Sequence, residues 1–203
     1  MKKKALEMAL QQIAQNPRPK SHLEQYPTPA NIAADVLFTA HALGDIEKKK
    51  VIDLGCGTGI FAIGAKLLGA KEVIGMDIDE EVIEIARENT RKFEIDVDFE
   101  RSKIKDFNVK CDTVVQNPPF GAQTKHADRP FLNVALNISS VVYSLHLTET
   151  QEFIERISRE HKAEITHRKR YDFEIRHTFE FHRKEKKYFD VTLFRLARAE
   201  GMR

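Results

Sequence analysis

Apolar residues recur along the chain with two different spacings. In some stretches they return every three or four positions, as in an amphipathic helix, and in others short runs rich in Val and Ile are typical of strands. Helical spacing lies at 2–14, 29–42, about 58–68, about 79–92, about 129–136 and about 148–160. Strand-like runs lie at 51–54, 72–77, 97–100, 111–116 and 139–145, with two longer alternating segments at 162–181 and 187–197.

Strands and helices alternate from residue 50 onward. Parallel strands need a crossover connection, which a helix supplies, so this order predicts a mostly parallel sheet with helices on both faces. The segments within 162–197 have no helix between them, so we expect a hairpin and an antiparallel C-terminal strand. The pattern therefore predicts an α/β protein with a seven-stranded sheet. Its 203 residues fit a single domain, in which residues 1–28 form an N-terminal helix and a linker.

Composition narrows the setting of the protein. Cys56 and Cys111 are far apart and lack C-x-x-C spacing, and the histidines lack metal-ligand spacing, so neither a disulfide framework nor a metal site is expected. No apolar run has the length of a membrane helix, and the first residues do not resemble a signal peptide, so we expect a cytoplasmic protein. Residues 161–198 hold eleven Lys or Arg against six Asp or Glu, an excess that fits either a solvated face or a phosphate-binding surface.

A glycine-rich loop follows the first predicted strand. It reads Asp-Leu-Gly-Cys-Gly-Thr-Gly from Asp53 to Gly59, with glycines at Gly55 and Gly57 that allow a tight turn and a close approach to a ligand. The dinucleotide fingerprint needs a further glycine where Ile60 stands, and no Gly-Lys-Ser/Thr follows, so phosphate-cradling loops fit poorly. A ligand without a pyrophosphate is therefore favoured.

Acidic residues bracket this loop. Asp53 ends the first strand, where it is expected to orient the loop and to hold a ligand ammonium through water. Asp77 ends the second strand, where a carboxylate accepts both hydroxyls of a ribose, and Ile78 follows it with a side chain suited to cover an adenine. Together these residues predict a site for S-adenosylmethionine.

The fourth predicted strand ends in Asn117-Pro118-Pro119-Phe120, which faces the same crevice because ligands of open parallel sheets lie beyond the carboxyl ends of the strands. The side-chain oxygen of Asn117 and the carbonyl of Pro118 form a pair of acceptors for the two N–H groups of an amine. Pro118 and Pro119 stiffen the loop, and Phe120 offers a flat face for stacking a base. Asn-Pro is also a common turn, and Phe120 would equally suit a core position.

The glycine loop with Asp77 resembles the class I S-adenosylmethionine-dependent methyltransferases, which have a Rossmann-like fold. Over the whole chain the sequence is similar to the methyltransferase-like protein 5 family, which methylates an adenosine N6 in ribosomal RNA, and to its archaeal relatives. The segments that carry this likeness are 23–29, 53–59, 75–79, 116–121 and 127–132.

This resemblance implies further site residues. Cofactor contacts are carried over to Gln25, Tyr26, Thr28, Thr58 and Ile60. From the residues alone, Gln25 and Tyr26 would equally serve as a cap and a staple before the next helix, with Thr28 as its cap. Many class I enzymes contact the adenine amine with an acid after the third strand, where this chain has Ser102 and Lys103. Eukaryotic members bind a small zinc-binding activator protein, for which the exposed edge near 96–101 would be the docking strand.

Three functions fit these observations. The first is N6-methylation of an adenosine in ribosomal RNA, which the Phe at position 120, the basic C-terminal part and the whole-chain likeness favour. The second is N5-methylation of a protein glutamine, because its amide needs the same two acceptors. The third is a non-catalytic scaffold in a ribonucleoprotein that keeps the cofactor, against which the intact Asn117 to Phe120 motif argues.

Overall fold

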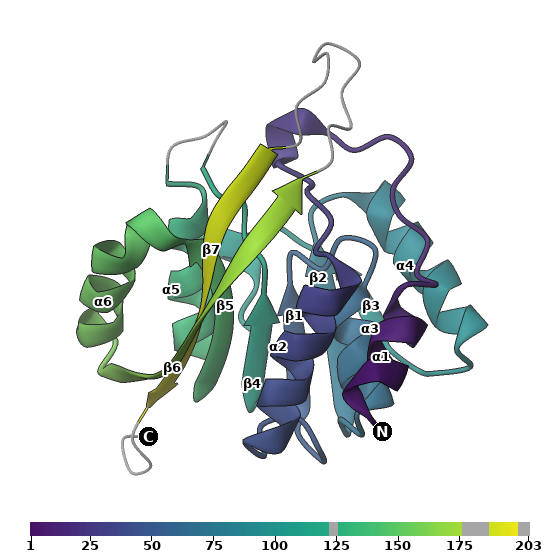
Figure 1. The fold of residues 1–203 in the computed structure, drawn as a ribbon, viewed down its shortest axis with the longest axis horizontal. Helices are drawn as coiled ribbons and strands as arrows, with labels where there is room; N and C mark the ends of the chain where they lie inside the picture. The colour runs from purple at the N-terminus through teal and green to yellow at the C-terminus, as the bar shows by residue number, and fades with distance from the viewer. Residues whose placement is uncertain (122–125, 176–186, 199–203) are drawn as a thin grey trace.

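The computed structural model describes residues 1–121, 126–175 and 187–198. Its described strands form one seven-stranded sheet in the order β3-β2-β1-β4-β5-β7-β6. The strands are β1 Lys50–Leu54, β2 Glu72–Asp77, β3 Asp98–Arg101, β4 Thr113–Gln116, β5 Val141–Leu147, β6 Ala163–Ile175 and β7 Lys187–Arg198. This sheet, with helices on both faces (Figure 1), confirms the predicted Rossmann-like α/β fold.

Strand directions follow from the connections. Each neighbouring pair from β3 through β5 is parallel, since a helix or a longer segment separates these strands along the chain. Among the described strands β7 alone runs the other way, antiparallel to both β5 and β6. The antiparallel C-terminal strand is therefore confirmed, although residues 176–181 of the predicted strand lie outside the described part of the chain.

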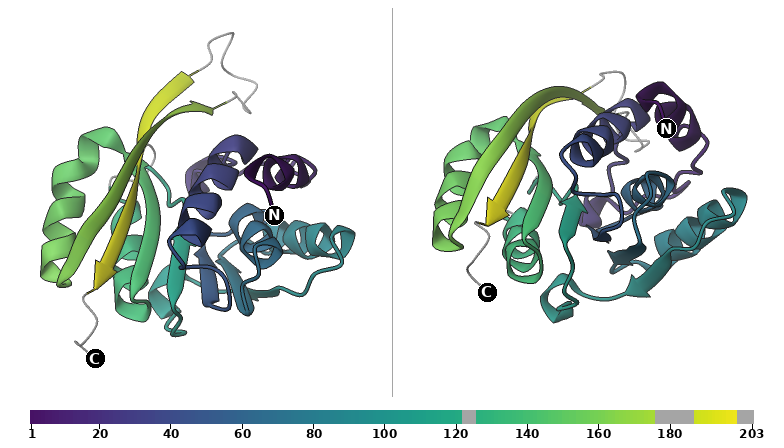
Figure 2. Two further views of the ribbon diagram at one scale, coloured as in Figure 1. Left: turned by 60° about the horizontal axis from the view of Figure 1, so that its bottom comes forward. Right: turned by 90° about the horizontal axis from the view of Figure 1, so that it is seen from below.

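Two helical layers cover the sheet (Figures 1 and 2). On one face lie α1 Lys3–Leu10, α2 Ala30–Ala42 and α3 Ile60–Leu67, and on the other lie α5 Asp128–Ile138 and α6 Gln151–Glu160. The helix α4 Glu80–Lys92 packs beside β2 and β3. Strand alternation separates the two cores, because Val51 of β1 joins the first apolar cluster and its neighbour Ile52 joins the second.

Some helix bounds differ from the predicted ones. The helix α1 ends at Leu10 rather than Ala14, because the buried side chain of Asn89 bonds both backbone groups of Ala14 and holds them outside the helix. Since glycines at 55, 57 and 59 all have positive φ, α3 begins at Ile60 instead of residue 58. A short 3₁₀ turn, Ser21–Leu23, was not predicted.

The start of α2 also differs. Its N-terminal cap position is Pro29, without a side-chain cap, so the expected capping role of Thr28 is wrong. The Thr28 hydroxyl instead contacts Asn117.

No helix within the described residues is long and apolar enough to cross a membrane.

Candidate active site at the carboxyl ends of the strands

The glycine loop lies against the end of β2. The Gly55 amide donates to the Met76 carbonyl at 2.8 Å, and the Gly57 amide donates to Asp77 Oδ2 at 2.9 Å. A Cβ added at Gly55 would lie 3.1 Å from the Phe131 ring, whereas a Cβ at Gly57 would have no atom within 4 Å. Gly57 therefore borders open space, although its φ of 52° still disfavours a side chain.

The two acids of the site have different surroundings. Asp53 lies beneath the loop and is 1% exposed, and its Oδ2 accepts from the Ala62 amide at 3.0 Å. Its Oδ1 has no hydrogen-bond partner among the described residues. Burial and the neighbouring Asp77 carboxylate raise the pKa of Asp53 to about 8. Asp77 accepts from Gly57 and from the Asp79 amide, and burial raises its pKa as well.

A cavity of about 380 Å³ lies beyond the strand ends. Its walls contain most of the residues that the sequence predicted for the site. These are Gln25, Tyr26, Gly55, Gly57, Thr58, Asp77, Ile78, Ser102, Asn117 and Pro119. The glycine loop, the acid of β2 and the Asn-Pro-Pro turn therefore border a single space.

Six of the predicted residues do not line this cavity, namely Thr28, Asp53, Gly59, Ile60, Pro118 and Phe120. A Cβ at Gly59 would lie 3.3 Å from Ala86 and from Phe99, so this glycine serves the packing of the loop on its neighbours. Ile60 is buried in the apolar core at the start of α3. For these residues a direct ligand contact stays a prediction.

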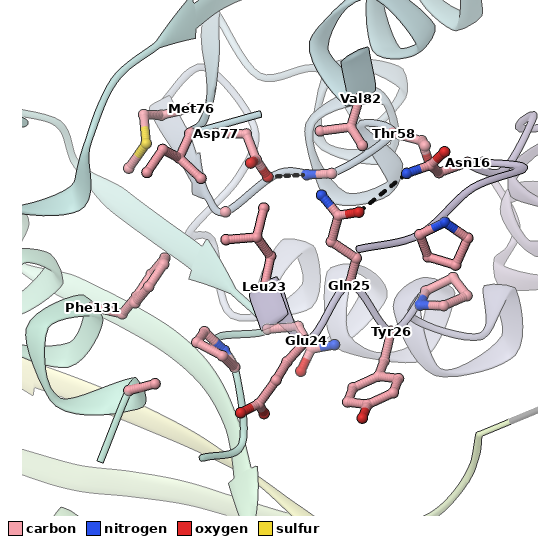
Figure 3. Close-up of a pocket in the computed structure, with 18 of the residues that line it drawn as sticks. Asn16, Leu23, Glu24, Gln25, Tyr26, Thr58, Met76, Asp77, Val82 and Phe131 are labelled. Atoms are coloured by element: carbon pink, nitrogen blue, oxygen red, sulfur yellow. Dashed lines mark hydrogen bonds between the residues drawn. The ribbon is translucent and has the colours of Figure 1, made fainter. Parts of the chain in front are cut away.

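A strap, defined as residues 15–27, covers the cavity opposite Asp77 (Figure 3). Gln25 is central to its position, because its Nε2 donates to Asp79 Oδ2 at 2.8 Å while its Oε1 accepts from Asn16 and from the Lys20 amide. The Lys20 ammonium lies 2.7 Å from the other Asp79 oxygen. Asp79 therefore fastens the strap beside the acid that ends β2.

The Asn-Pro-Pro-Phe motif is tied to the same part of the chain. Asn117 Nδ2 donates to the Thr28 hydroxyl at 3.0 Å, whereas Asn117 Oδ1 is buried and has no hydrogen-bond partner in the part of the chain that the structure describes. The Gly121 amide donates to Glu24 Oε2 at 2.9 Å. Thr28 thus fixes the amide so that its oxygen is left available as an acceptor.

Phe120 lies against the C-terminal strands. Its ring meets Phe173 edge-on at 5.8 Å between centroids and lies 6.3 Å from Phe189. The ring is half-buried, so one part of it packs as a core residue while the rest remains accessible. Both roles that the sequence left open for Phe120 are therefore compatible with its position.

Several wall residues were not predicted from the sequence. Met76, Val82, Ile104 and Phe131 line the cavity with apolar atoms, and Leu23 reaches into it from the strap (Figure 3). Met76 and Phe131 lie within a strand and a helix, where their spacing indicates core positions. Their places in the sequence could have identified both as wall residues, because Met76 directly precedes Asp77 and Phe131 lies in the 127–132 segment.

The order of the strands, the glycine loop, the acid after the second strand and the Asn-Pro-Pro-Phe turn define an S-adenosylmethionine-dependent methyltransferase of class I. A Danio rerio protein named rRNA N(6)-adenosine-methyltransferase METTL5 is 40% identical and covers 96% of this chain and 98% of its own length. The Drosophila melanogaster protein of the same name is 36% identical, with 96% of both covered. The chain therefore belongs to the METTL5 family.

Two further comparisons agree with the class. The crystal structure of a candidate RNA methyltransferase from Pyrococcus horikoshii is 46% identical, with a TM-score of 0.91 over 98% of both chains. The family model of the ribosomal protein L11 methyltransferase (PrmA) matches residues 34–118. That match covers the glycine loop and Asp77 but ends inside the Asn-Pro-Pro-Phe motif.

Proposed function

We propose that this chain transfers the methyl group of S-adenosylmethionine to N6 of an adenosine in ribosomal RNA. The observation that carries the proposal is the buried oxygen of Asn117, which lacks a partner among the described residues beside a cavity large enough for ligand, while Thr28 holds the nitrogen of the same amide. Buried polar atoms in proteins are nearly always hydrogen-bonded, so such an atom points to a ligand that supplies the missing donor. Full-length relatives are named rRNA N6-adenosine methyltransferases.

An exocyclic amine suits this arrangement chemically. Its lone pair is delocalised into the ring, which makes the nitrogen a poor nucleophile. If one N–H donates to Asn117 Oδ1 and the other to the Pro118 carbonyl, the nitrogen is held in a pyramidal form with its lone pair aimed at the methyl group. Positioning of this kind accounts for much of the rate acceleration in a two-substrate reaction.

The cofactor-binding residues are proposed from the walls of the cavity. Asp77 would accept the ribose hydroxyls, and Gly57 would allow a close approach at the position where a Cβ has open space around it. Ile78 lines the cavity and is 43% exposed, so its side chain is available to cover the adenine. When bound, S-adenosylmethionine supplies an activated methyl group on a sulfonium.

The glutamine alternative is less favoured. The PrmA match comes from a protein methyltransferase, but it covers only residues 34–118, which hold the glycine loop and Asp77 and end inside the Asn-Pro-Pro-Phe motif. Relatives matched over the full length bear RNA names instead. The half-buried Phe120 beside the motif would stack one face of the base.

A small zinc-binding activator protein is proposed to add a strand at β3. This strand is one edge of the sheet, and Asp98, Glu100 and Arg101 on it are exposed. Edge strands present unpaired backbone groups that a partner strand can use.

A cytoplasmic location stays a prediction.

Labelling tests the reaction directly. The purified protein is incubated with methyl-labelled S-adenosylmethionine and either total RNA or protein extract, and RNA is digested to nucleosides to identify the product. We expect label in N6-methyladenosine, lost in Asn117→Ala but kept in Asn137→Ala, which changes an exposed asparagine of α5. Label in protein glutamine, or no label with either substrate while the cofactor still binds, would overturn the proposal.

A further inference from the structure

A chain of buried hydrogen bonds runs beside the Asn117 motif without touching the cavity. Gln116 Nε2 donates to Ser144 Oγ at 2.9 Å, Ser144 Oγ lies 2.6 Å from His146 Nε2, and His146 Nδ1 lies 3.2 Å from Asp128 Oδ2. Gln116 and Ser144 are 0% exposed, His146 is 1% exposed and Asp128 is 7% exposed. The four side chains therefore form a connected, desolvated network.

The donors of this network follow from its chemistry. An amide nitrogen only donates, so Gln116 uses an acceptor site on the Ser144 oxygen and leaves the Ser144 hydrogen for His146. When the Ser144 hydroxyl donates to Nε2 of His146, the Nδ1 atom carries the hydrogen that is donated to Asp128. This arrangement of hydrogens satisfies all three contacts.

The serine, histidine and carboxylate stand in the order of a hydrolase triad, but their burial excludes that role. A nucleophile has to reach its substrate, whereas the Ser144 hydroxyl is fully buried and neither Ser144 nor His146 lines the cavity. The oxygen of Ser144 is also occupied by the Gln116 amide. The network therefore acts on other residues of the protein.

The position of the network indicates which residues these are. Gln116 is the last residue of β4 and directly precedes Asn117, whereas Asp128 is the first residue of α5. The network thus joins β5 to the residues on either side of the segment 117–127, and Ser144 of β5 lies in register with Gln116. We propose, on the basis of the proposed methyl transfer, that Gln116, Ser144, His146 and Asp128 are positioning residues that hold the Asn117 acceptor in its reactive place.

The other residues on the same sheet face indicate that the network positions Asn117 rather than stabilises the fold. Closer to the amino ends of β4 and β5 this face carries Val114 and Val142, which belong to the same buried apolar cluster as Leu132 of α5. Apolar side chains in the last layer would stabilise the fold at least as well as a buried polar chain does. Hydrogen bonds add direction, because each fixes one distance and one angle between the parts it joins.

The test compares two buried serines, Ser144 in the middle of β5 and Ser139 between α5 and β5. Ser144→Ala breaks the network, whereas Ser139→Ala removes a hydroxyl that is 2% exposed and bonds only backbone carbonyls away from the motif. We expect kcat for RNA methylation to fall about tenfold or more in Ser144→Ala, with KM for RNA and Kd for S-adenosylmethionine within about twofold of the wild type. Ser139→Ala is expected to keep the wild-type kcat, and Ser144→Thr, which retains the hydroxyl, to recover most of it.

A second variant guards against misfolding. Asp128→Ala removes the acceptor at the network's least buried member, and we expect a fall in kcat that does not add to that of Ser144→Ala, because either change breaks the same connection. Equal kcat values for Ser144→Ala and Ser139→Ala, or additive losses in the double variant of Ser144→Ala with Asp128→Ala, would overturn the positioning role. Absence of methyl transfer by the wild type would instead refute the proposed function.

Discussion

Two buried polar clusters of this protein differ in how fully their atoms are paired. In the first, Asp45 Oδ2 accepts from the Tyr143 hydroxyl at 2.5 Å and from Arg195 Nε at 2.8 Å, while Asp45 Oδ1 accepts from Arg195 Nη2 at 3.1 Å. The second cluster lies at the carboxyl ends of β1 and β4. There, one oxygen each of Asp53, Gln116 and Asn117 is buried with no partner in the described residues.

The difference separates structure from function. A fully paired cluster ties the loop before β1 to β5 and β7 and gives no reason to expect a ligand. A buried acceptor without a donor is costly, by about 1 to 3 kcal/mol, and persists where the surrounding fold enforces it. Changes in the first cluster should therefore affect stability, and changes in the second should affect methyl transfer.

The largest effect is expected for Arg195→Met. This change leaves the buried Asp45 carboxylate without its cation, so the free energy of unfolding should fall by about 3 to 5 kcal/mol. Methyl transfer per folded molecule should stay unchanged at a temperature where the variant is folded. Urea unfolding measures the first quantity, and Lys169→Met, which removes a half-exposed partner of Asp35, serves as control with a loss below about 1 kcal/mol.

Asn117→Ala should show the opposite behaviour. Methyl transfer is expected to fall by about 10² to 10³, the usual effect of removing one polar contact to the reacting group, while the free energy of unfolding stays the same or rises. The rise would come from removing a buried acceptor that lacks a donor. Combined loss of stability and activity would show that the Asn117 amide has a structural role like that of Asp45.

How far the sequence predicted these clusters depends on the range of the contacts. Strand and helix periods predicted the sheet, and the glycines and acids of 53–77 predicted the cofactor end of the cavity, because these signals are local. The contact of Thr28 with Asn117 joins residues 89 positions apart, and His146 of β5 meets Asp128 at the start of α5. Such pairings leave no periodic pattern, so Thr28 was assigned as a cap and the His146 network was not predicted.

A pH effect is expected at Asp53. The pKa of Asp53 is about 8 in the folded protein and 3.8 in the unfolded chain. Between these two pH values the folded state therefore binds more protons than the unfolded state. Stability should therefore fall as pH rises through this window, and Asp53→Asn should remove that slope and be the more stable protein at pH 8. Thermal unfolding of both proteins from pH 5 to pH 8 measures the difference. Parallel curves would contradict a protonated Asp53, although Asp77, whose pKa is also raised, contributes a slope of the same sign to both.

The smallest effect is expected for a change at Asp79, which holds the strap of residues 15–27 in place. Asp79 is 6% exposed, and its burial opposes the charged form. Hydrogen bonds from Lys20 and Gln25 nevertheless hold the pKa of Asp79 below 3.8. The contacts of Asp79 with the strap therefore persist at neutral pH. Asp79→Asn keeps an oxygen to accept from the Glu81 amide but loses the ion pair with Lys20.

We expect S-adenosylmethionine to dissociate about five times faster from Asp79→Asn, because the strap opens more often. The Kd should rise accordingly, with little change in the free energy of unfolding. Stopped-flow measurement of the dissociation rate tests this. The control is Glu81→Gln, which loses only the longer 3.3 Å contact of Lys20 to an exposed carboxylate and should release cofactor at the wild-type rate. If both variants behave alike, Asp79 belongs with the structural cluster of Asp45, and the strap is held closed by Glu24 and its contact with Gly121 instead.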